Sequence, residues 1–507
     1  MGLKQSIVGR GKKILLSPSV MRWVSDDRVM KAAEGVMDAR SRVKAAVSIL
    51  VKGHELPNID PALDEYPEAP APRPASKKNG AAAPAAKTHG SDDMTESLKE
   101  RNTLSGIGSK DVFEKCYKFT AADNARKMGI YPYFRPLDVN DGPEAEIDGK
   151  RVVMFGSNNY LGLTTHPKVR EAAKSAIDRF GTSMTGSRLV NGSMKLHEEF
   201  EDKLAKWMGK ESALVFTTGY QVNLTVLSAL LSNKKSVAVI DRNVHASLYD
   251  GVRLGQAAGA RMVRYRHNDP TSLDRALEKI EDDEGAFVIT DGVFSAEGEI
   301  AKLDEIVKVV KKHGARLFVD DAHALGVIGP GGRGTAHHFG VMDDVDLVGG
   351  TFSKTLASIG GWLVGERKVL DYVRHFAPSF MFAAAAAPPN VAAAMAAFEV
   401  MQEESWRIDK LHDNFNYMRD ELKKMGFELG HTETAVIPIY IRQDLRTIMM
   451  WRDLLDDYGI YTNPFISPGV PPKNAMLRTS YMATHEREHL DRGLEAFRIV
   501  GKKYGVI

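Results

Sequence analysis

The chain has 507 residues, of which 43% are hydrophobic and 26% are charged, and its formal net charge is +2 at pH 7. A chain of this length can bury a large core and is expected to hold more than one domain. The small net charge gives no reason to expect nucleic-acid binding, and no uninterrupted apolar run is long enough to span a bilayer. The single cysteine, Cys116, cannot form an internal disulfide, which favours a cytoplasmic protein.

Two zones precede the part of the chain that reads as an enzyme. Residues 1–56 are basic, with apolar residues at helical spacing such as Val29, Ala33 and Val36, which predicts an amphipathic helical extension. Such a segment fits peripheral contact with the inner face of an anionic membrane. It fits a solvated appendage or a partner-docking arm equally well. Residues 57–94 are rich in Pro, Ala, Gly and Lys, which predicts a disordered linker.

From residue 95 onward, short apolar runs alternate with longer amphipathic stretches. The runs that predict buried strands are 213–216, 237–240, 286–289, 317–319 and 347–348. Leu273–Ile280 and Leu303–His313 predict helices between them. This alternation indicates an α/β fold, with a mainly parallel sheet covered by helices and ligands bound at the carboxyl ends of the strands.

The same pattern suggests how the enzyme is divided. We expect an N-terminal segment over 95–155, a large domain over 156–387 and a smaller α+β domain over 388–507. The smaller domain begins near a Pro-Pro pair and contains the apolar run 435–440, which predicts a strand. It ends in an amphipathic stretch after His485, which predicts a helix.

The end of the strand at 347–348 leads into Thr351-Phe352-Ser353-Lys354. A lysine beside hydroxyl residues is suited to a Schiff base, with the Thr351 and Ser353 hydroxyls placed to meet a phosphate. By itself a Ser-Lys pair is most often part of a solvated loop, so the prediction needs support from other strand ends.

That support comes from the strand at 317–319, which runs directly into Asp320 and then His323. A buried carboxylate keeps a pyridinium nitrogen protonated, and this makes the ring an electron sink. An isolated aspartate in this position would more often cap the next helix.

Two further strand ends complete the pattern. His245 follows the strand at 237–240, where an imidazole can stack on a planar cofactor, although a lone histidine is more often a structural residue. Gly219 and Tyr220 follow the strand at 213–216 and open a helix whose amides can receive a phosphate. Together the four strand ends predict one bound pyridoxal phosphate (PLP).

The chain from 111 to 507 resembles the α-oxoamine synthase family. The motifs that carry the resemblance are 157–163, 186–192, the His245 segment, 320–323 and 351–354. The resemblance implies a fold type I PLP-dependent transferase with a mainly parallel seven-stranded sheet and a smaller C-terminal α+β domain. It also implies a homodimer with the active site shared between subunits, and the decarboxylating condensation of a small amino acid with an acyl thioester.

Within this family, four segments resemble the bacterial serine palmitoyltransferases, namely 114–117, 131–136, 264–269 and 463–468. This implies that L-serine and a long-chain acyl-CoA such as palmitoyl-CoA give 3-ketosphinganine and CO2, the first step of sphingolipid synthesis. A glycine C-acetyltransferase, an 8-amino-7-oxononanoate synthase and a non-catalytic regulatory or scaffold subunit stay open as alternatives. So does the choice between CoA and a carrier protein as acyl donor.

The resemblance also assigns roles to residues. Lys354 would bind the cofactor and move the α-proton, Asp320 would pair with the pyridine nitrogen, and His323 would bond the phenolic oxygen. His245 would stack on the ring and help to hold the substrate. Gly219, Tyr220, Thr351 and Ser353 would meet the phosphate, and no metal is expected.

Three more residues complete the expected site. Ser295 would lie near the cofactor, and Asn159 would belong to the substrate site. Arg478 would pair with the substrate carboxylate, a bidentate task that suits a guanidinium. The alternative for Arg478 is an ion pair on the domain surface.

Overall fold

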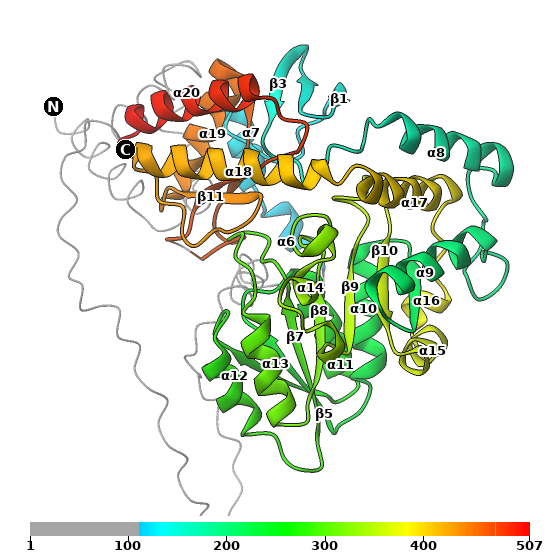
Figure 1. Cartoon of the computed structure of the whole chain (residues 1–507). Coiled ribbons are helices and arrows are strands. Elements are labelled where there is room, and N and C mark those ends of the chain that lie inside the picture. Colours follow the sequence, from blue (N-terminus) through cyan, green and yellow to red (C-terminus); the bar gives the residue numbers. More distant parts are fainter. Residues whose placement is uncertain (1–110, 472) are drawn as a thin grey trace, which may run out of the picture.

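The structure is a computed structural model that describes residues 111–471 and 473–507. The predicted extension 1–56, with its proposed membrane contact, the linker 57–94 and residues 95–110 lie outside the described residues. In Figure 1, a large sheet with its helices fills the lower half of the molecule, and long C-terminal helices with two smaller sheets fill the upper half. None of the helices in the described part of the chain is both long and apolar enough to cross a membrane.

The large sheet has seven strands. Its order is β4 (Ser212–Phe216), β10 (Gly361–Gly365), β9 (Leu347–Thr351), β8 (Arg316–Asp320), β7 (Gly285–Asp291), β5 (Ser236–Asp241) and β6 (Arg261–Tyr265). β10 runs antiparallel to both of its neighbours, and the other pairs are parallel. Every residue of β5 is buried, as expected for a strand covered on both faces. The predicted seven-stranded, mainly parallel sheet is confirmed.

Two strands of this sheet have no counterpart in the sequence prediction. β6 is an edge strand whose residues are mostly half-buried or exposed, so it lacks a continuous apolar run. β10 is only five residues long and begins and ends with glycine. A Cβ at Gly361 would lie 2.6 Å from Val222 Cγ2, so the glycine serves the packing of the helix that follows β4.

Helices surround this sheet. They are α9 (Lys195–Met208), α10 (Gly219–Leu230), α11 (Ala246–Ala257), α12 (Pro270–Leu277), α13 (Leu303–Lys312), α14 (Thr335–His338), α15 (Arg367–Phe376) and α16 (Pro378–Met381). Short 3-10 helices lie at Pro330–Gly332 and Met342–Asp344. The helix predicted from Leu273 begins three residues earlier, because Asp269 caps it by accepting a hydrogen bond from Ser272 N and Pro270 fits its first turn.

The C-terminal part has the predicted α+β character. Its helices are α17 (Pro388–Glu403), α18 (Trp406–Met425), α19 (Asp444–Tyr458) and α20 (Arg487–Lys503). A three-stranded antiparallel sheet has the order β11 (Val436–Tyr440), β14 (Met476–Ser480), β13 (Asn463–Phe465). α17 packs against α8 (Pro167–Phe180), which leads into the large sheet.

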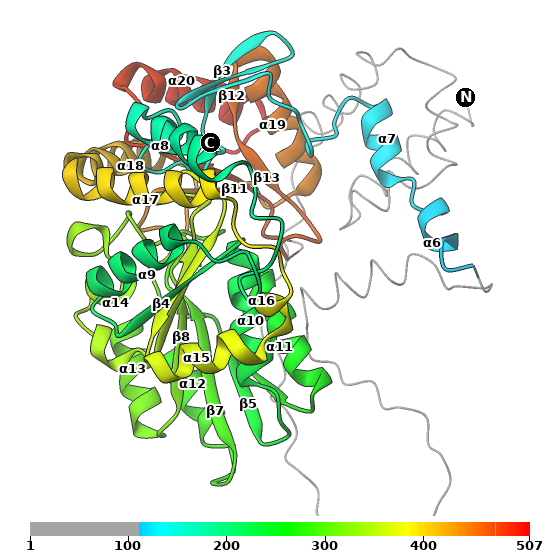
Figure 2. The ribbon, with the colours of Figure 1, turned by 90° about the vertical axis from the view of Figure 1, so that its right-hand side faces the viewer.

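The N-terminal segment is joined to this C-terminal part. β1 (Val139–Asp141), β2 (Glu144–Ile147) and β3 (Lys150–Met154) form a sheet with β12 (Ile460–Tyr461). The predicted domain limits stay predictions, and this sheet crosses the limits at 155 and 388. Before it, α6 (Glu114–Tyr117) and α7 (Ala121–Lys127) project from one side of the molecule (Figure 2).

Candidate active site

Loops at the carboxyl ends of β4, β5, β7, β8 and β9 meet around a cavity of about 300 Å³. Eight of the residues predicted for the site line it, namely Gly219, Tyr220, His245, Asp320, His323, Thr351, Ser353 and Lys354. The cavity is also lined by residues that the sequence analysis did not single out, among them Asn223, Ser247 and Asp291. Residues as distant in the chain as Thr218 and Gly360, 142 positions apart, therefore converge on this cavity, because parallel strands end at one edge of the sheet.

Asp320 is buried at the end of β8, with 6% of its surface exposed. Its Oδ2 accepts a hydrogen bond from Asn223 Nδ2 at 2.7 Å, and its Oδ1 accepts one from Ala322 N at 3.0 Å. Asn223 also donates to Ser247 Oγ at 2.8 Å. These donors stabilise a buried carboxylate, which is the group that a pyridinium nitrogen requires.

Asn223 was missed by the sequence analysis. It lies on α10, in the otherwise largely apolar stretch Val222-Asn223-Leu224, and it is 2% exposed. A polar side chain inside a buried helical stretch needs a hydrogen-bond partner. The sequence therefore indicated that Asn223 bonds another buried group. The identity of the partner, Asp320, depends on how α10 packs against β9 and β10 and was not readable from the sequence.

Lys354 follows β9 and is half-buried in the cavity wall. Burial lowers the pKa of its amine to about 8, against the opposing effect of the Asp320 charge and with a further lowering from Arg478. Part of the amine is therefore neutral near neutral pH, as a nucleophile or base requires.

His323 is buried, and its Nδ1 lies 2.7 Å from the hydroxyl oxygen of Tyr160. Burial lowers the pKa of this imidazole well below its ordinary value, and the positive charges of Lys354 and Arg478 add to the effect. The ring is therefore neutral at physiological pH. Tyr160 lies in the predicted motif 157–163, but its contact with His323 spans 163 positions and was not anticipated.

His245 stands at the start of α11, where its Nδ1 lies 2.7 Å from Ser247 Oγ. Its backbone N donates to Asp291 Oδ2 at 3.2 Å, so the buried end of β7 fixes the backbone from which the ring projects. Partial burial lowers the pKa of His245. A neutral imidazole beside the cavity suits contact with a planar ring.

The amino end of α10 lies against Thr351. A Cβ at Gly219 would lie 2.5 Å from Thr351 Cβ, so glycine permits this approach. Thr351 Oγ1 in turn lies 2.7 Å from Ser353 Oγ. Backbone amides at the start of a helix together with two hydroxyls could hold a phosphate, as the sequence predicts. Tyr220 contributes its ring, which lies 6.2 Å from that of His245 between centroids, while its hydroxyl donates to Asp250.

Arg478, on β14, is 3% exposed and does not form the surface ion pair that was the alternative reading. Its Nε donates to Ser295 O at 2.9 Å, and its Nη1 donates to Asn158 Oδ1 at 2.7 Å and to Ser480 Oγ at 2.6 Å. Ser295 thus meets Arg478 through its backbone carbonyl. The guanidinium is close enough to the cavity for its charge to lower the pKa of Lys354.

Asn159 does not line the cavity. Its Nδ2 donates to Thr164 Oγ1 at 2.8 Å, and its Oδ1 accepts from Leu163 N at 3.0 Å, so its amide holds the turn of the 157–163 motif. The neighbouring Asn158 is the residue that contacts Arg478. A substrate contact of Asn159 stays a prediction.

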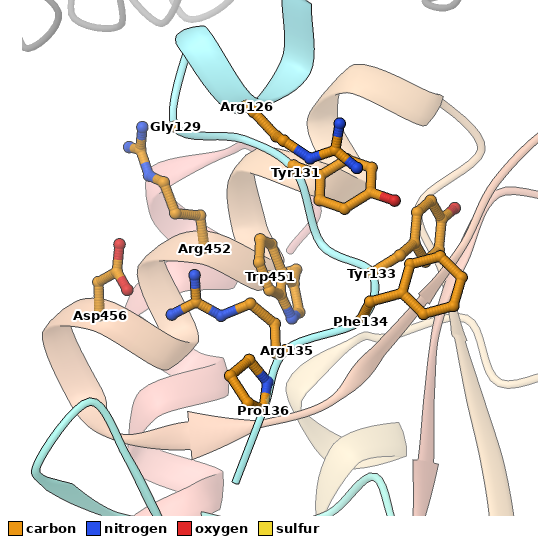
Figure 3. Close-up of a pocket in the computed structure, with 10 residues that line it drawn as sticks. All are labelled: Arg126, Gly129, Tyr131, Tyr133, Phe134, Arg135, Pro136, Trp451, Arg452 and Asp456. Carbon is orange, nitrogen blue, oxygen red and sulfur yellow. The ribbon is translucent and has the colours of Figure 1, made fainter. Parts of the chain in front are cut away.

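A second cavity, of about 350 Å³, lies between α7 with the chain that follows it and α19 (Figure 3). Its wall combines aromatic rings with arginines, and the indole Nε1 of Trp451 is buried there without a hydrogen-bond partner among the described residues. None of the residues predicted for the cofactor lines it.

Residues 150–497 match the family model described as aminotransferase class I and II, and the chain belongs to this family. Its fold is the type I fold of PLP-dependent transferases. Serine palmitoyltransferase of Sphingobacterium spiritivorum is 43% identical over 75% of this chain and 94% of that protein. An 8-amino-7-oxononanoate synthase of Thermoanaerobacter pseudethanolicus is 38% identical over 76% of this chain and 97% of that protein. A solved structure of serine palmitoyltransferase with PLP covers 78% of this chain and 100% of its own, with a TM-score of 0.75 at 34% identity.

The contact between Asn223 and Asp320 predicts a stability effect. The Asn223→Leu substitution removes one of the donors to a buried carboxylate and should lower the free energy of unfolding by roughly 1–3 kcal/mol. Urea unfolding of the cofactor-free protein measures this free energy. Asn233→Leu, the same change on an exposed turn, is the control. Equal stability of the two variants would contradict the proposed support of Asp320.

Proposed function

We propose that this chain catalyses the PLP-dependent condensation of L-serine with a long-chain acyl-CoA such as palmitoyl-CoA. The reaction joins the α-carbon of serine to the acyl carbonyl carbon, expels the CoA thiol and loses the serine carboxylate as CO2, which gives 3-ketosphinganine. The observation that carries the proposal is the convergence of Lys354, Asp320 and His323 on one cavity. The chain that holds them is 43% identical to a serine palmitoyltransferase.

The cavity has the groups that PLP requires. The Asp320 carboxylate would hold the pyridine nitrogen, Lys354 would bind the aldehyde through its amine, and the start of α10 with Thr351 and Ser353 would hold the phosphate. His245 would cover one face of the ring, and His323 would bond the phenolic oxygen. When bound, PLP withdraws electrons from the α-carbon of an attached amino acid, which acidifies its proton and later favours loss of the carboxylate.

The chain's own residues then have defined tasks. Lys354, whose pKa is about 8, is available as a neutral amine that removes the α-proton when it is not attached to the cofactor. Arg478 is held in place by neutral oxygens of Ser295, Asn158 and Ser480, so its positive charge has no carboxylate partner in these contacts. It would therefore bind the carboxylate of the incoming amino acid.

The activity is tested by thiol release from palmitoyl-CoA by the purified, PLP-loaded protein. We expect release that depends on L-serine more than on glycine or L-alanine. Lys354→Ala should lower the rate by ~10²–10⁴-fold or more, because the loss of a positioned acid–base group alone has an effect in this range. Arg478→Lys should raise the KM for serine, because an ammonium group lacks the fork of a guanidinium.

Other outcomes of the same assay separate the alternatives. Preference for glycine or alanine would contradict serine specificity and favour a glycine C-acetyltransferase or an 8-amino-7-oxononanoate synthase. If protein that carries PLP releases no thiol with any pair of substrates, the CoA-dependent reaction is contradicted. That result would favour a carrier-protein donor or a non-catalytic subunit.

We infer further that two copies of the chain assemble with the cavity near their interface. Large apolar side chains are exposed beside it, with Val190 73% exposed and Phe382 72% exposed. The two segments that carry them are joined, because Ala385 N donates to Gly186 O at 2.9 Å. Thr217, next to the cavity, donates to Ala384 O in the same segment. Large apolar side chains exposed on two joined segments are typical of an interaction surface.

The assembly is tested by the molar mass in solution. Val190→Asp and Phe382→Asp place a charge in the proposed interface, so we expect each to shift the protein from dimer to monomer in sedimentation velocity. Trp406→Asp, on α18, alters another exposed aromatic residue and should leave the dimer intact. Monomeric wild-type protein, or a dimer that tolerates both interface charges, would contradict the inference.

A further inference from the structure

The segment 264–269, which resembles serine palmitoyltransferases, has no part in the site described above. Its His267 follows β6 at the edge of the sheet where the cavity lies, but it does not line the cavity. His267 Nδ1 lies 3.2 Å from Oδ1 of Asp241, the fully buried last residue of β5. Its Nε2 lies 3.4 Å from Glu299 Oε2, at ion-pair distance, and its ring meets Phe294 edge to face with centroids 4.3 Å apart. His267 therefore bridges the end of β5 and the 292–300 segment that follows β7.

The bridge is ionic. Burial by itself would disfavour the imidazolium, but the hydrogen bond with Asp241 and the nearby Glu299 carboxylate outweigh it and raise the pKa of His267 to about 10. The ring is therefore a cation between two carboxylates at neutral pH. A third acid, Glu297, accepts a hydrogen bond from Asn243 Nδ2 at 3.0 Å, which ties the same segment to the chain after β5 a second time.

Asn268 provides another attachment. It adopts a φ of 49°, a conformation that asparagine tolerates better than most residues, and its backbone N donates to Asp241 Oδ2 at 2.7 Å. Its side-chain Nδ2 donates to Ile300 O at 3.0 Å, and its Oδ1 accepts from Lys302 N at 2.9 Å. Both ends of one amide thus hold the chain as it leaves the 292–300 segment.

The opposite side of the 292–300 segment contacts the C-terminal part of the chain. Gly298 O accepts hydrogen bonds from Glu433 N at 3.1 Å and from Thr434 Oγ1 at 3.0 Å. Gly298 has a φ of 69°, and a Cβ there would collide with the carbonyl oxygen of Val436 on β11. β11 pairs with β14, the strand of Arg478. From the segment itself, the Ser295 carbonyl accepts the hydrogen bond of Arg478 Nε at 2.9 Å.

We propose that His267 and Asn268 are positioning residues that hold the 292–300 segment so that the Ser295 carbonyl orients the guanidinium of Arg478 toward the amino-acid carboxylate. The inference rests on the role proposed above for Arg478. Neither residue lines the cavity. If the segment becomes more mobile, the hydrogen bond from Arg478 Nε to Ser295 O is weakened. The guanidinium of Arg478 then occupies the orientation that binds a carboxylate for less of the time.

Two disruptive variants and one conservative variant test this in the PLP-loaded protein. Asn268→Gly preserves the positive φ and removes the side-chain amide. His267→Leu removes the cation between Asp241 and Glu299, and His267→Gln restores a donor of similar length. The control is His313→Leu, because His313 also pairs with an aspartate, with Nε2 2.7 Å from Asp274 Oδ1, at the end of α13 and away from the 292–300 segment.

Two readouts are needed. Hydrogen exchange of peptides that cover 292–300 should become faster in Asn268→Gly and His267→Leu, with partial recovery in His267→Gln and no change in the control. The Kd for L-serine, measured from the change in cofactor absorbance, should rise roughly tenfold, which corresponds to about 1.4 kcal/mol. PLP content and the KM for palmitoyl-CoA should stay within about twofold of wild type, because the groups that bind the cofactor are unchanged.

Unchanged exchange of 292–300 in both variants would overturn the proposal, and so would faster exchange with an unaltered Kd for serine. Failure of the underlying function is recognised separately with Arg478→Lys. If that substitution does not weaken serine binding, the role of Arg478 is wrong, and the exchange rates then decide by themselves whether His267 and Asn268 hold the segment.

Discussion

A buried carboxylate at the end of β8 is the constraint on which the rest of the cavity depends. Asp320 is almost withdrawn from water, and an unpaired charge there would be costly. Asn223 from α10 and the amide of Ala322 supply hydrogen bonds, and Lys354 lies near enough for the Asp320 charge to raise its pKa against the effect of burial. The Asp320 charge thus favours the charged form of the Lys354 amine, and a cofactor with a cationic ring nitrogen and an aldehyde matches both groups.

The sheet determines where these groups can meet. β8 and β9 are parallel neighbours, so Asp320 and the segment after Thr351 leave the sheet at the same edge. α10 can reach that edge only because Gly219 lets its first turn approach Thr351. Arg478 comes from the other sheet, on β14, where Ser295 and Asn158 hold it close enough to the cavity for its charge to lower the pKa of Lys354. The substrate-binding part of the proposed site is thus built across two layers of the fold.

Much of this arrangement was predictable, for a physical reason. The strands β4, β5, β7, β8 and β9 are buried on both faces and appear as continuous apolar runs, and the polar residues directly after them mark the ligand-binding edge. β6 was missed because most of its residues are half-buried or exposed and include two arginines, and β10 because a short strand bounded by glycines has little apolar signal. The helix predicted at Leu303–His313 closely matches α13, since its apolar face is regular.

The contacts that support the site were harder to foresee. Tyr160 meets His323 across 163 positions, Asn223 meets Asp320 across 97, and Asn158 meets Arg478 across 320. Local pattern shows that each residue is polar and near a motif, but the partner depends on how distant segments pack. Asn158 and Asn159 illustrate the limit, because adjacent residues of one motif point to different partners and periodicity does not say which one faces Arg478.

The central claim is that Lys354 is the lysine that holds PLP. Its most direct test is borohydride reduction of the PLP-loaded protein, which fixes the cofactor to the amine that carries it, followed by mass spectrometry of the peptides. We predict the pyridoxyl group on Lys354, with none incorporated in Lys354→Ala. Attachment to another lysine, or no attachment in protein that contains PLP, would contradict the account.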